Sequence, residues 1–214
     1  MRKKLLLPAI LVLGLALCTV AFGKTAVGVK KGDWIEYQVT TTGSPEEGHD
    51  VTWARMEILD VQGTEVSVNV TTKAANGTFD SGIMKLNPAE GRVGVWFIIP
   101  ADLNTGDAFY DASVGRNVTI EGSQQREIAG ATRTVTHAST PERIKSWDKL
   151  TGVFVESIDV LPNYTLNAIA DKTNLWSPQI LGADATLFYA LLLSVVFVVV
   201  AGALLVAVYR KRKR

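Results

Sequence analysis

Cysteine is almost absent from this sequence, and its absence excludes several kinds of chemistry. The only cysteine, Cys18, lies in an apolar N-terminal segment that we expect to be removed. The remaining chain then has no thiol, which excludes disulfide bonds, thiolate metal sites and cysteine nucleophiles. An exported domain without disulfides suits a bacterial or archaeal surface protein that is stabilised by a sizeable core.

Histidine is scarce too, and the motifs that would mark an enzyme are missing. His49 and His137 are the only two histidines. Neither lies in a Gly-x-Ser-x-Gly elbow or in the His-Glu-x-x-His motif of metalloproteases, and the sequence contains neither motif. Two carboxylates from different strands could still act on a glycoside, but nothing in the sequence indicates such a pair. We therefore expect a protein that is not an enzyme and has no cofactor.

Two acidic segments deserve comparison with metal sites. The run from Asp102 to Asp107 resembles the beginning of a calcium loop, but Gly106 comes one position early and Ser113 replaces the bidentate glutamate. The other segment contains Glu46, Glu47, His49 and Asp50. Such a run of charge is more typical of a solvated loop than of a metal site, so we predict no metal.

Charge is missing from one long segment near the C-terminus. From Leu187 to Val208 the only polar side chain is Ser194. A helix of this length spans about 33 Å, enough to cross a bilayer core of about 30 Å. The basic cluster Arg210–Arg214 follows directly and favours the cytoplasmic side. The pattern predicts a transmembrane helix over 187–209 and a basic cytoplasmic tail over 210–214.

The N-terminus has the pattern of a secretory signal peptide. Arg2, Lys3 and Lys4 precede an apolar run from Leu5 to Val20, and Ala21-Phe22-Gly23 offers small residues for cleavage before Lys24. A retained first helix is the alternative, but the run is short and contains a proline. With residues 1–23 removed, we expect a single-pass type I protein of the cell membrane whose N-terminal domain is extracellular.

The charges are unevenly distributed between the predicted domain and its flanks. All 21 acidic residues but only 14 of the 22 basic residues lie between Lys24 and Ala185, so this part is acidic by about seven charges. An acidic surface argues against nucleic acid as a partner, because phosphate binding requires a basic patch. The basic tail serves topology and contact with anionic lipids.

Residues 24–182 are predicted to form one extracellular β domain. Ile35, Tyr37 and Val39 alternate with polar residues and share one face of a strand. In the turn that follows Asp148, we expect Gly152 to take a positive φ. Short strands separated by turn signals predict an all-β antiparallel meander, which forms a curled sheet, a half-barrel or a sandwich. The expected strands are Trp34–Val39, Val51–Val61, Thr64–Thr72, Phe79–Leu86, Gly94–Ile99, Asn117–Glu121, Gln125–Ile128, Ala131–His137, Arg143–Trp147, Val153–Ile158 and Tyr164–Ala170.

Four Asn-x-Thr sequons are candidate glycosylation sites. They begin at Asn69, Asn76, Asn117 and Asn163. All four lie on the side of the membrane to which the domain is exported. Asn69 falls opposite the valine face of its strand, which predicts exposure. The alternative is that a threonine-rich β protein produces such sequons by chance.

Aromatic residues are spread through the predicted strands. The most prominent are Trp34, Tyr37, Trp53, Trp96 and Trp147. They could fill the concave face of a curled sheet as ordinary core. They could also form an apolar face that binds a lipid or another hydrophobic ligand. The sequence leaves both interpretations open.

Three short patches carry a resemblance to a known group of proteins. They are Gly32-Asp-Trp-Ile-Glu-Tyr37, Ile99-Pro-Ala-Asp-Leu103 with Gly106-Asp107, and Trp147-Asp-Lys-Leu-Thr-Gly-Val153. In these the chain resembles a broad group of poorly characterised, mostly archaeal β proteins that are secreted or anchored at the C-terminus. Its expected architecture is also similar to that of the half-barrel lipoprotein carriers. Neither resemblance supplies catalytic residues.

These features predict a non-enzymatic cell-surface protein whose β domain binds a surface protein, a glycan or a lipid close to the membrane. Two alternatives remain: a carrier or sensor of a hydrophobic ligand in a half-barrel, and a structural accessory subunit of a membrane or surface-layer assembly. A continuous apolar pocket above about 300 Å³ would favour the carrier, whereas a filled core would favour the other two.

Overall fold

The computed structural model describes residues 27–46, 48–180 and 183–212, and the side chains of its C-terminal helix are described as far as Val200. The predicted signal peptide, residues 1–23, lies outside the described residues. So do Glu47, which belongs to one acidic segment, and residues 213–214 of the predicted tail.

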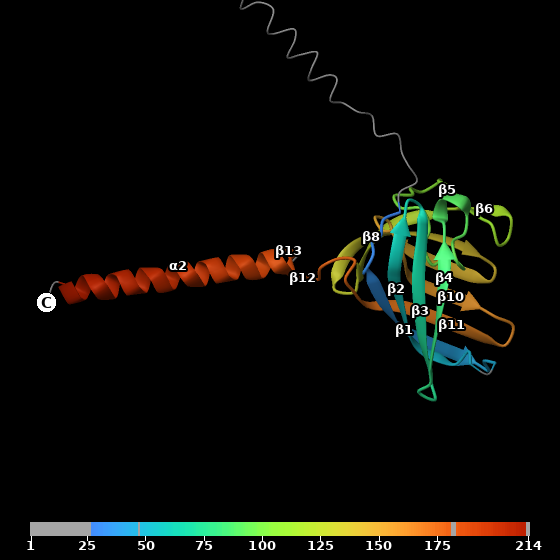
Figure 1. The fold of residues 1–214 in the computed structure, drawn as a ribbon, viewed down its shortest axis with the longest axis horizontal. Helices are drawn as coiled ribbons and strands as arrows, with labels where there is room; N and C mark the ends of the chain where they lie inside the picture. Colours follow the sequence, from blue (N-terminus) through green and yellow to red (C-terminus); the bar gives the residue numbers. More distant parts are fainter. Residues whose placement is uncertain (1–26, 47, 181–182, 213–214) are drawn as a thin grey trace, which may run out of the picture.

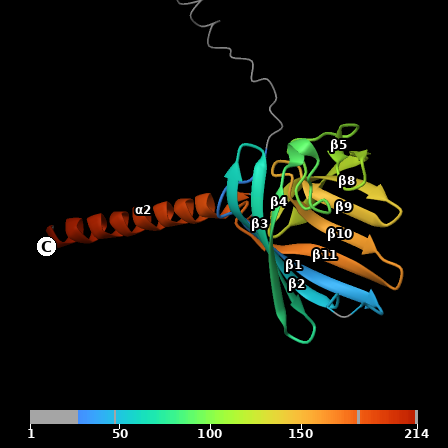
Figure 2. The same ribbon diagram turned by 45° about the vertical axis from the view of Figure 1, so that its right-hand side comes forward.

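Nine strands form one antiparallel sheet, in the order β4-β3-β2-β1-β11-β10-β9-β8-β7 (Figure 1). Within the described residues the sheet does not close, because β4 and β7 are its two edges. Figure 2 shows how strongly the sheet curls. The strands are β1 Trp34–Gly43, β2 Val51–Gln62, β3 Glu65–Ala74, β4 Phe79–Leu86, β7 Gly122–Ile128, β8 Ala131–Thr140, β9 Arg143–Asp148, β10 Phe154–Val160 and β11 Tyr164–Thr173.

The strand order divides the sheet into two arms. The chain runs outward from β1 to β4, and later returns inward from β7 to β11. The two arms join where β1 pairs with β11, from Ile35 opposite Thr173 to Gly43 opposite Tyr164. Between the arms, residues 87–121 cross from one edge of the sheet to the other. This crossing segment contains a 3₁₀ turn, η1 Pro88–Glu90, and a small ribbon of β5 Ala108–Asp111 and β6 Arg116–Thr119.

The strands of the sheet have two ends that differ in what lies beyond them. At the helix end, β11 leads through β12 Gln179–Ile180 and β13 Ala183–Asp184 into α2 Ala185–Arg212, which projects away from the sheet (Figure 1). The far end holds the β1–β2, β3–β4, β8–β9 and β10–β11 turns. Along the described part of the chain, no helix has the length and hydropathy that crossing a membrane requires.

The core occupies the inner face of the sheet at the helix end. There the crossing segment packs its apolar side chains against those of the strands. The indole of Trp96 lies 5.8 Å from the rings of both Trp147 and Phe109. The strands contribute Ile35, Met56, Ile58, Val66, Val68, Val135 and Trp147, and the crossing segment contributes Val93, Trp96, Ile98, Ile99, Phe109, Val118 and Ile120.

The structure confirms the β-rich fold with one large antiparallel sheet, and it corrects one of the predicted strands. The positive φ expected at Gly152 is present, at 70°. Gly94–Ile99, however, is not a strand but a turn with positive φ at Gly94, Val95 and Trp96. The turn directs the Trp96 indole into the core, where its Nε1 donates to the Asp111 carboxylate at 2.6 Å. Burial of a large aromatic ring has overridden the local β pattern.

Candidate functional site: a cavity at the far end of the sheet

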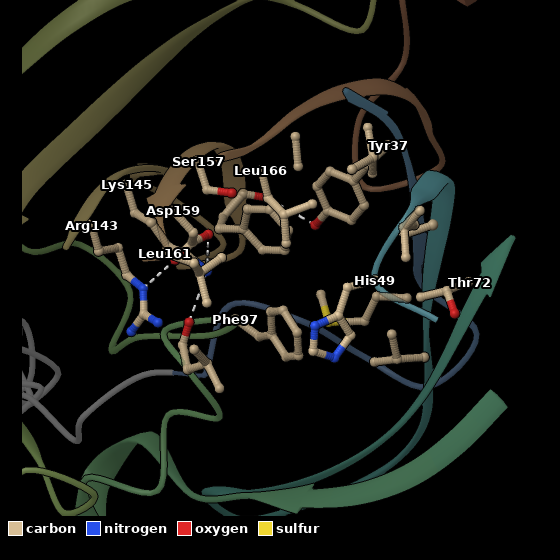
Figure 3. Close-up of a pocket in the computed structure, with 18 of the residues that line it drawn as sticks. Tyr37, His49, Thr72, Phe97, Arg143, Lys145, Ser157, Asp159, Leu161 and Leu166 are labelled. Atoms are coloured by element: carbon tan, nitrogen blue, oxygen red, sulfur yellow. Dashed lines mark hydrogen bonds and ion pairs between the residues drawn. The ribbon is translucent and has the colours of Figure 1, made fainter. Parts of the chain in front are cut away.

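A cavity of about 330 Å³ opens on the inner face at the far end of the sheet (Figure 3). Six strands and three connecting segments contribute to its walls, which are mostly apolar. The apolar lining consists of Tyr37, Val39, Val51, Ala54, Met56, Val70, Val95, Phe97, Phe154, Leu161, Leu166 and Ala168. The polar residues at the cavity are His49, Arg55, Thr72, Arg143, Lys145, Ser157, Asp159 and Tyr164, of which Arg55 directs its guanidinium to the outer face, over Trp34.

Strand alternation places the lining side chains on one face. On β11, Leu166 and Ala168 line the cavity, whereas Ile169, the residue after Ala168, is exposed on the other side. On β3, Val68 and Val70 point the same way, but Val68 is fully buried and Val70 is only half-buried. The same inward face of one strand thus passes from packed core into open cavity within two residues.

The crossing segment sets the boundary of the cavity. Its turn at residues 94–97 lies between the core and the void, with Val95 and Phe97 among the lining side chains. Val95 has a φ of 53°, which is strained for a β-branched residue. The Lys145 ammonium donates to the Val95 carbonyl oxygen at 2.8 Å and so holds this turn. Strained backbone of this kind concentrates at ligand clamps and switches.

One end of the cavity is charged. The Lys145 side chain on β9 is 3% exposed, and its Nζ lies 4.7 Å from the centre of the Phe154 ring and 5.2 Å from that of Phe97. Its ammonium is 4.0 Å from Asp159, whose carboxylate also accepts from the Arg143 guanidinium. Burial lowers the pKa of Lys145 from 10.5 to about 8; the Asp159 charge opposes this shift and the Arg143 charge adds to it. The lining therefore holds a buried ammonium group that releases its proton at a lower pH than an exposed lysine does.

Two hydrogen bonds tie further side chains of the lining to groups of the protein itself. His49 Nδ1 lies 2.5 Å from the Tyr164 hydroxyl, and the two side chains hydrogen-bond to each other. Tyr37 donates its hydroxyl to the Phe154 carbonyl oxygen at 2.9 Å, and burial raises its pKa well above 10. Its ring stacks on that of Phe154 at 4.2 Å. Tyr37 therefore presents an apolar ring to the cavity, with its hydroxyl already bonded.

The five aromatic residues predicted as a ligand face do not share one face. Tyr37 lines the cavity, whereas Trp96 and Trp147 are buried in the core at the helix end. Trp34 lies on the outer face beneath the Arg55 guanidinium, at 4.3 Å. Trp53 lies on the same outer face, edge-on to the exposed ring of Phe79 at 6.2 Å. The period of two already separates Trp34 from Tyr37.

The charged residues of the cavity are those that sequence reasoning missed. Arg143 and Lys145 alternate with Ile144, on the same face as Trp147. A predicted inward Trp147 therefore already implied that the two preceding alternate positions also point inward. Position in the hairpin is therefore the signal that the sequence offers, although cations are seldom found inside a sheet.

Three of the four asparagines predicted as glycosylation sites are exposed, whereas Asn69, for which strand alternation predicted exposure, is not. Asn76, Asn117 and Asn163 are exposed in turns or at strand edges. Asn69 is half-buried, and its amide lies 3.4 Å from the hydroxyl of Thr71 on the outer face of β3.

The described residues of the two acidic segments include no metal-binding cluster. Asp107 closes its own turn, accepting from the backbone N–H of Asn104 at 2.7 Å. That bond and a second one from the Asn104 side chain lower the pKa of Asp107. Among the residues that the structure describes, no group of three or more histidine, aspartate, glutamate or cysteine side chains could hold a metal.

Neither family models nor curated proteins provide a relative of this chain. No family model matches the sequence, and no curated protein is significantly similar to it. The function therefore has to be argued from the cavity itself.

Proposed function

We propose that this protein is a surface receptor or carrier that binds a hydrophobic ligand in a half-barrel close to a membrane. The cavity of about 330 Å³ is the observation that carries the proposal. Protein interiors are close-packed, and an apolar void of this size forfeits contacts that a filled core would make. Its volume lies in the range of small-molecule sites, and it favours the carrier or sensor over a filled binding module.

The size of the cavity limits what it can hold. At about 30 Å³ for each group the size of a water molecule, 330 Å³ accommodates about ten such groups. A single hydrocarbon chain of about ten carbons fits this volume, whereas a two-chain lipid would have to leave most of its mass outside. The aromatic walls formed by Tyr37, Phe97 and Phe154 suit the side of such a chain.

The proposed membrane anchor rests on the sequence of the C-terminal segment. The sequence from Leu187 to Val208 carries no charge, and the described helix exposes apolar side chains from Leu187 to Val200. Exposed apolar surface of this extent favours a lipid environment. Because the cavity lies at the far end of the sheet, its ligand would enter from the side opposite the anchor.

A photoreactive hydrocarbon tests the proposed binding. The full chain in phosphatidylcholine nanodiscs would be irradiated with a ten-carbon alcohol that carries a terminal diazirine. We expect labelled peptides from the cavity walls, such as those containing Val39 and Leu166, identified by mass spectrometry. Labelling confined to α2 would contradict the proposal.

A matched pair of variants on β11 provides the control. Ala168→Phe places a ring into the cavity and is expected to lower labelling of its walls several-fold. Ile169→Phe places the same ring on the outer face and should leave labelling unchanged. Equal labelling in both variants would show that the probe binds elsewhere.

The anchor is tested separately, by topology. Protease added to intact cells is expected to digest the β domain and to spare an epitope placed after Arg214. Extraction with alkaline carbonate should leave the full chain in the membrane fraction. Release of the chain by carbonate would contradict the proposed anchor, but it would not bear on ligand binding in the cavity.

A further inference from the structure

We propose that the ligand of this cavity is an amphiphile with an anionic oxygen head group, a carboxylate or a phosphate, which Lys145 and Arg143 bind. The inference rests on the proposed function and names the class of ligand. Both cations lie on β9 at the same end of an otherwise apolar void. An amphiphile would place its chain along the apolar walls and its head at this end (Figure 3).

Lys145 has hydrogen-bonding capacity that the protein itself does not use. An ammonium group has three donors. Among the described residues, one donor is accepted by the Val95 carbonyl oxygen, and the Asp159 carboxylate lies at 4.0 Å, beyond hydrogen-bond length. The rings of Phe97 and Phe154 lie beside the ammonium, at 5.2 and 4.7 Å, and accept no hydrogen bond of ordinary strength from it. An anionic oxygen in the cavity would accept the donors that are left.

The charge of the site matches an anion. Arg143 and Lys145 face one carboxylate, Asp159, and the hydroxyl of Ser157, so this end carries one excess positive charge. The domain as a whole is acidic, with 21 acidic residues against 14 basic ones between Lys24 and Ala185. A buried, incompletely paired cation destabilises a fold, so its position at the end of an apolar cavity is better explained by a ligand than by stability.

Competing head groups are disfavoured by the same side chains. A quaternary ammonium head would meet the excess positive charge, and Asp159, the one carboxylate among the described lining residues, is already paired with Arg143. A neutral alcohol could accept a hydrogen bond from Lys145 but would leave the charge uncompensated. Hydrogen bonds to ionised groups are stronger than neutral ones, which favours the anion by about tenfold or more.

Competition for the photoreactive alcohol measures this preference. The full chain in phosphatidylcholine nanodiscs would be titrated with decanoate, decyl phosphate, decanol and decyltrimethylammonium. We expect one or both anions to suppress labelling of the cavity walls at concentrations at least about tenfold below decanol, and the cation to be the weakest competitor. The two anionic arms tell a carboxylate from a phosphate head.

Substitution of the buried lysine tests the assignment of the head-group site. In Lys145→Met, the anions should suppress labelling only at the concentrations at which decanol does. Decanol itself should still compete with the probe. Lys172→Met removes a matched but exposed lysine from β11 and should leave the preference intact. Lys145→Gln keeps a donor for the Val95 carbonyl oxygen without the charge, and it should behave as the methionine variant does.

The outcomes separate this inference from the function on which it rests. If no amphiphile suppresses labelling, the proposed function fails. If all four compete equally, or if the anion preference survives Lys145→Met, the function stands and the anionic head group is overturned. A preference that weakens in the wild type between pH 7 and pH 10 but is absent from Lys145→Met would support it, because Lys145 loses its charge in that interval.

Discussion

The two ends of the inner face are built from the same strands, yet one is packed and the other is open. At the helix end the crossing segment 87–121 covers the sheet with Trp96, Ile98 and Phe109. At the far end the described part of that segment reaches no further than Val95 and Phe97, and a cavity of about 330 Å³ remains. The comparison teaches that the covering segment, rather than the pattern of the strands, decides where this sheet holds a cavity.

The largest difference between the ends should appear at glycines in their turns. At the helix end, a Cβ on Gly152 would lie 2.1 Å from the Ile99 carbonyl oxygen, and the residue has a positive φ. At the far end, Gly77 also has a positive φ, but nothing lies within 4 Å of its added Cβ. We expect Gly152→Val to lower the free energy of unfolding by about 4 kcal/mol or more, and Gly77→Val by about 1–2 kcal/mol.

Thermal unfolding of the full chain, followed by tryptophan fluorescence, measures both glycine variants. The five tryptophans all precede α2, so the signal reports the β domain. Equal losses in the two variants would show that strain in φ alone dominates and that the contact with the crossing segment is unimportant.

A smaller contrast is expected between two valines on β3. Val68 is fully buried in the packed end, whereas Val70 borders the cavity two residues later. Val68→Ala should destabilise the domain by roughly 2–3 kcal/mol, because it leaves a hole in packed core. Val70→Ala only enlarges an existing cavity and should cost under about 1 kcal/mol. Denaturant titration of the two variants checks the ratio, and equal costs would mean that the far end is packed as tightly as the core.

The smallest expected effect is stabilisation at the open end. Between pH 8 and 10.5 the unfolded chain binds a proton on Lys145 that the folded chain has released, so this group makes stability rise with pH. Lys145→Met removes the buried charge and should stabilise the domain at pH 7 by about 1–2 kcal/mol. Unfolding at pH 7 and pH 10 is the measurement, and the advantage of the variant should shrink at the higher pH. If the variant were more stable than the wild type by the same amount at both pH values, burial would not lower the pKa of Lys145.

Local pattern was sufficient for most of the sheet because its hairpins are local. Alternation on β1 and β3 and the turn at Gly152 predicted strands and faces that the structure contains. The same reasoning failed at Gly94–Ile99, where an apolar run of strand-like composition bends to bury the Trp96 indole. Nothing within that run reveals the bend, since its cause is a core assembled from residues on both arms.

The site was harder to predict than the fold. Tyr37 could be assigned to the inner face from its own strand, but Asp159 and Lys145 meet through pairing between β9 and β10. The cavity itself depends on how far the crossing segment extends over the sheet. A cavity is space that no side chain fills, so neither the composition nor the alternation of the strands predicts it directly.

The pairing of β1 with β11 has a consequence for the order of folding. The Thr173 hydroxyl donates to the carbonyl oxygen of Trp34, 139 positions earlier in the chain. Strands β1 to β4 can pair locally, but one edge of β1 has no partner until β11 has been synthesised, and closing so large a loop is slow. The nascent domain would therefore expose a strand edge, with its risk of aggregation, until shortly before α2 appears. Completion of the sheet and arrival of the helix are thus expected to be nearly simultaneous events in biosynthesis.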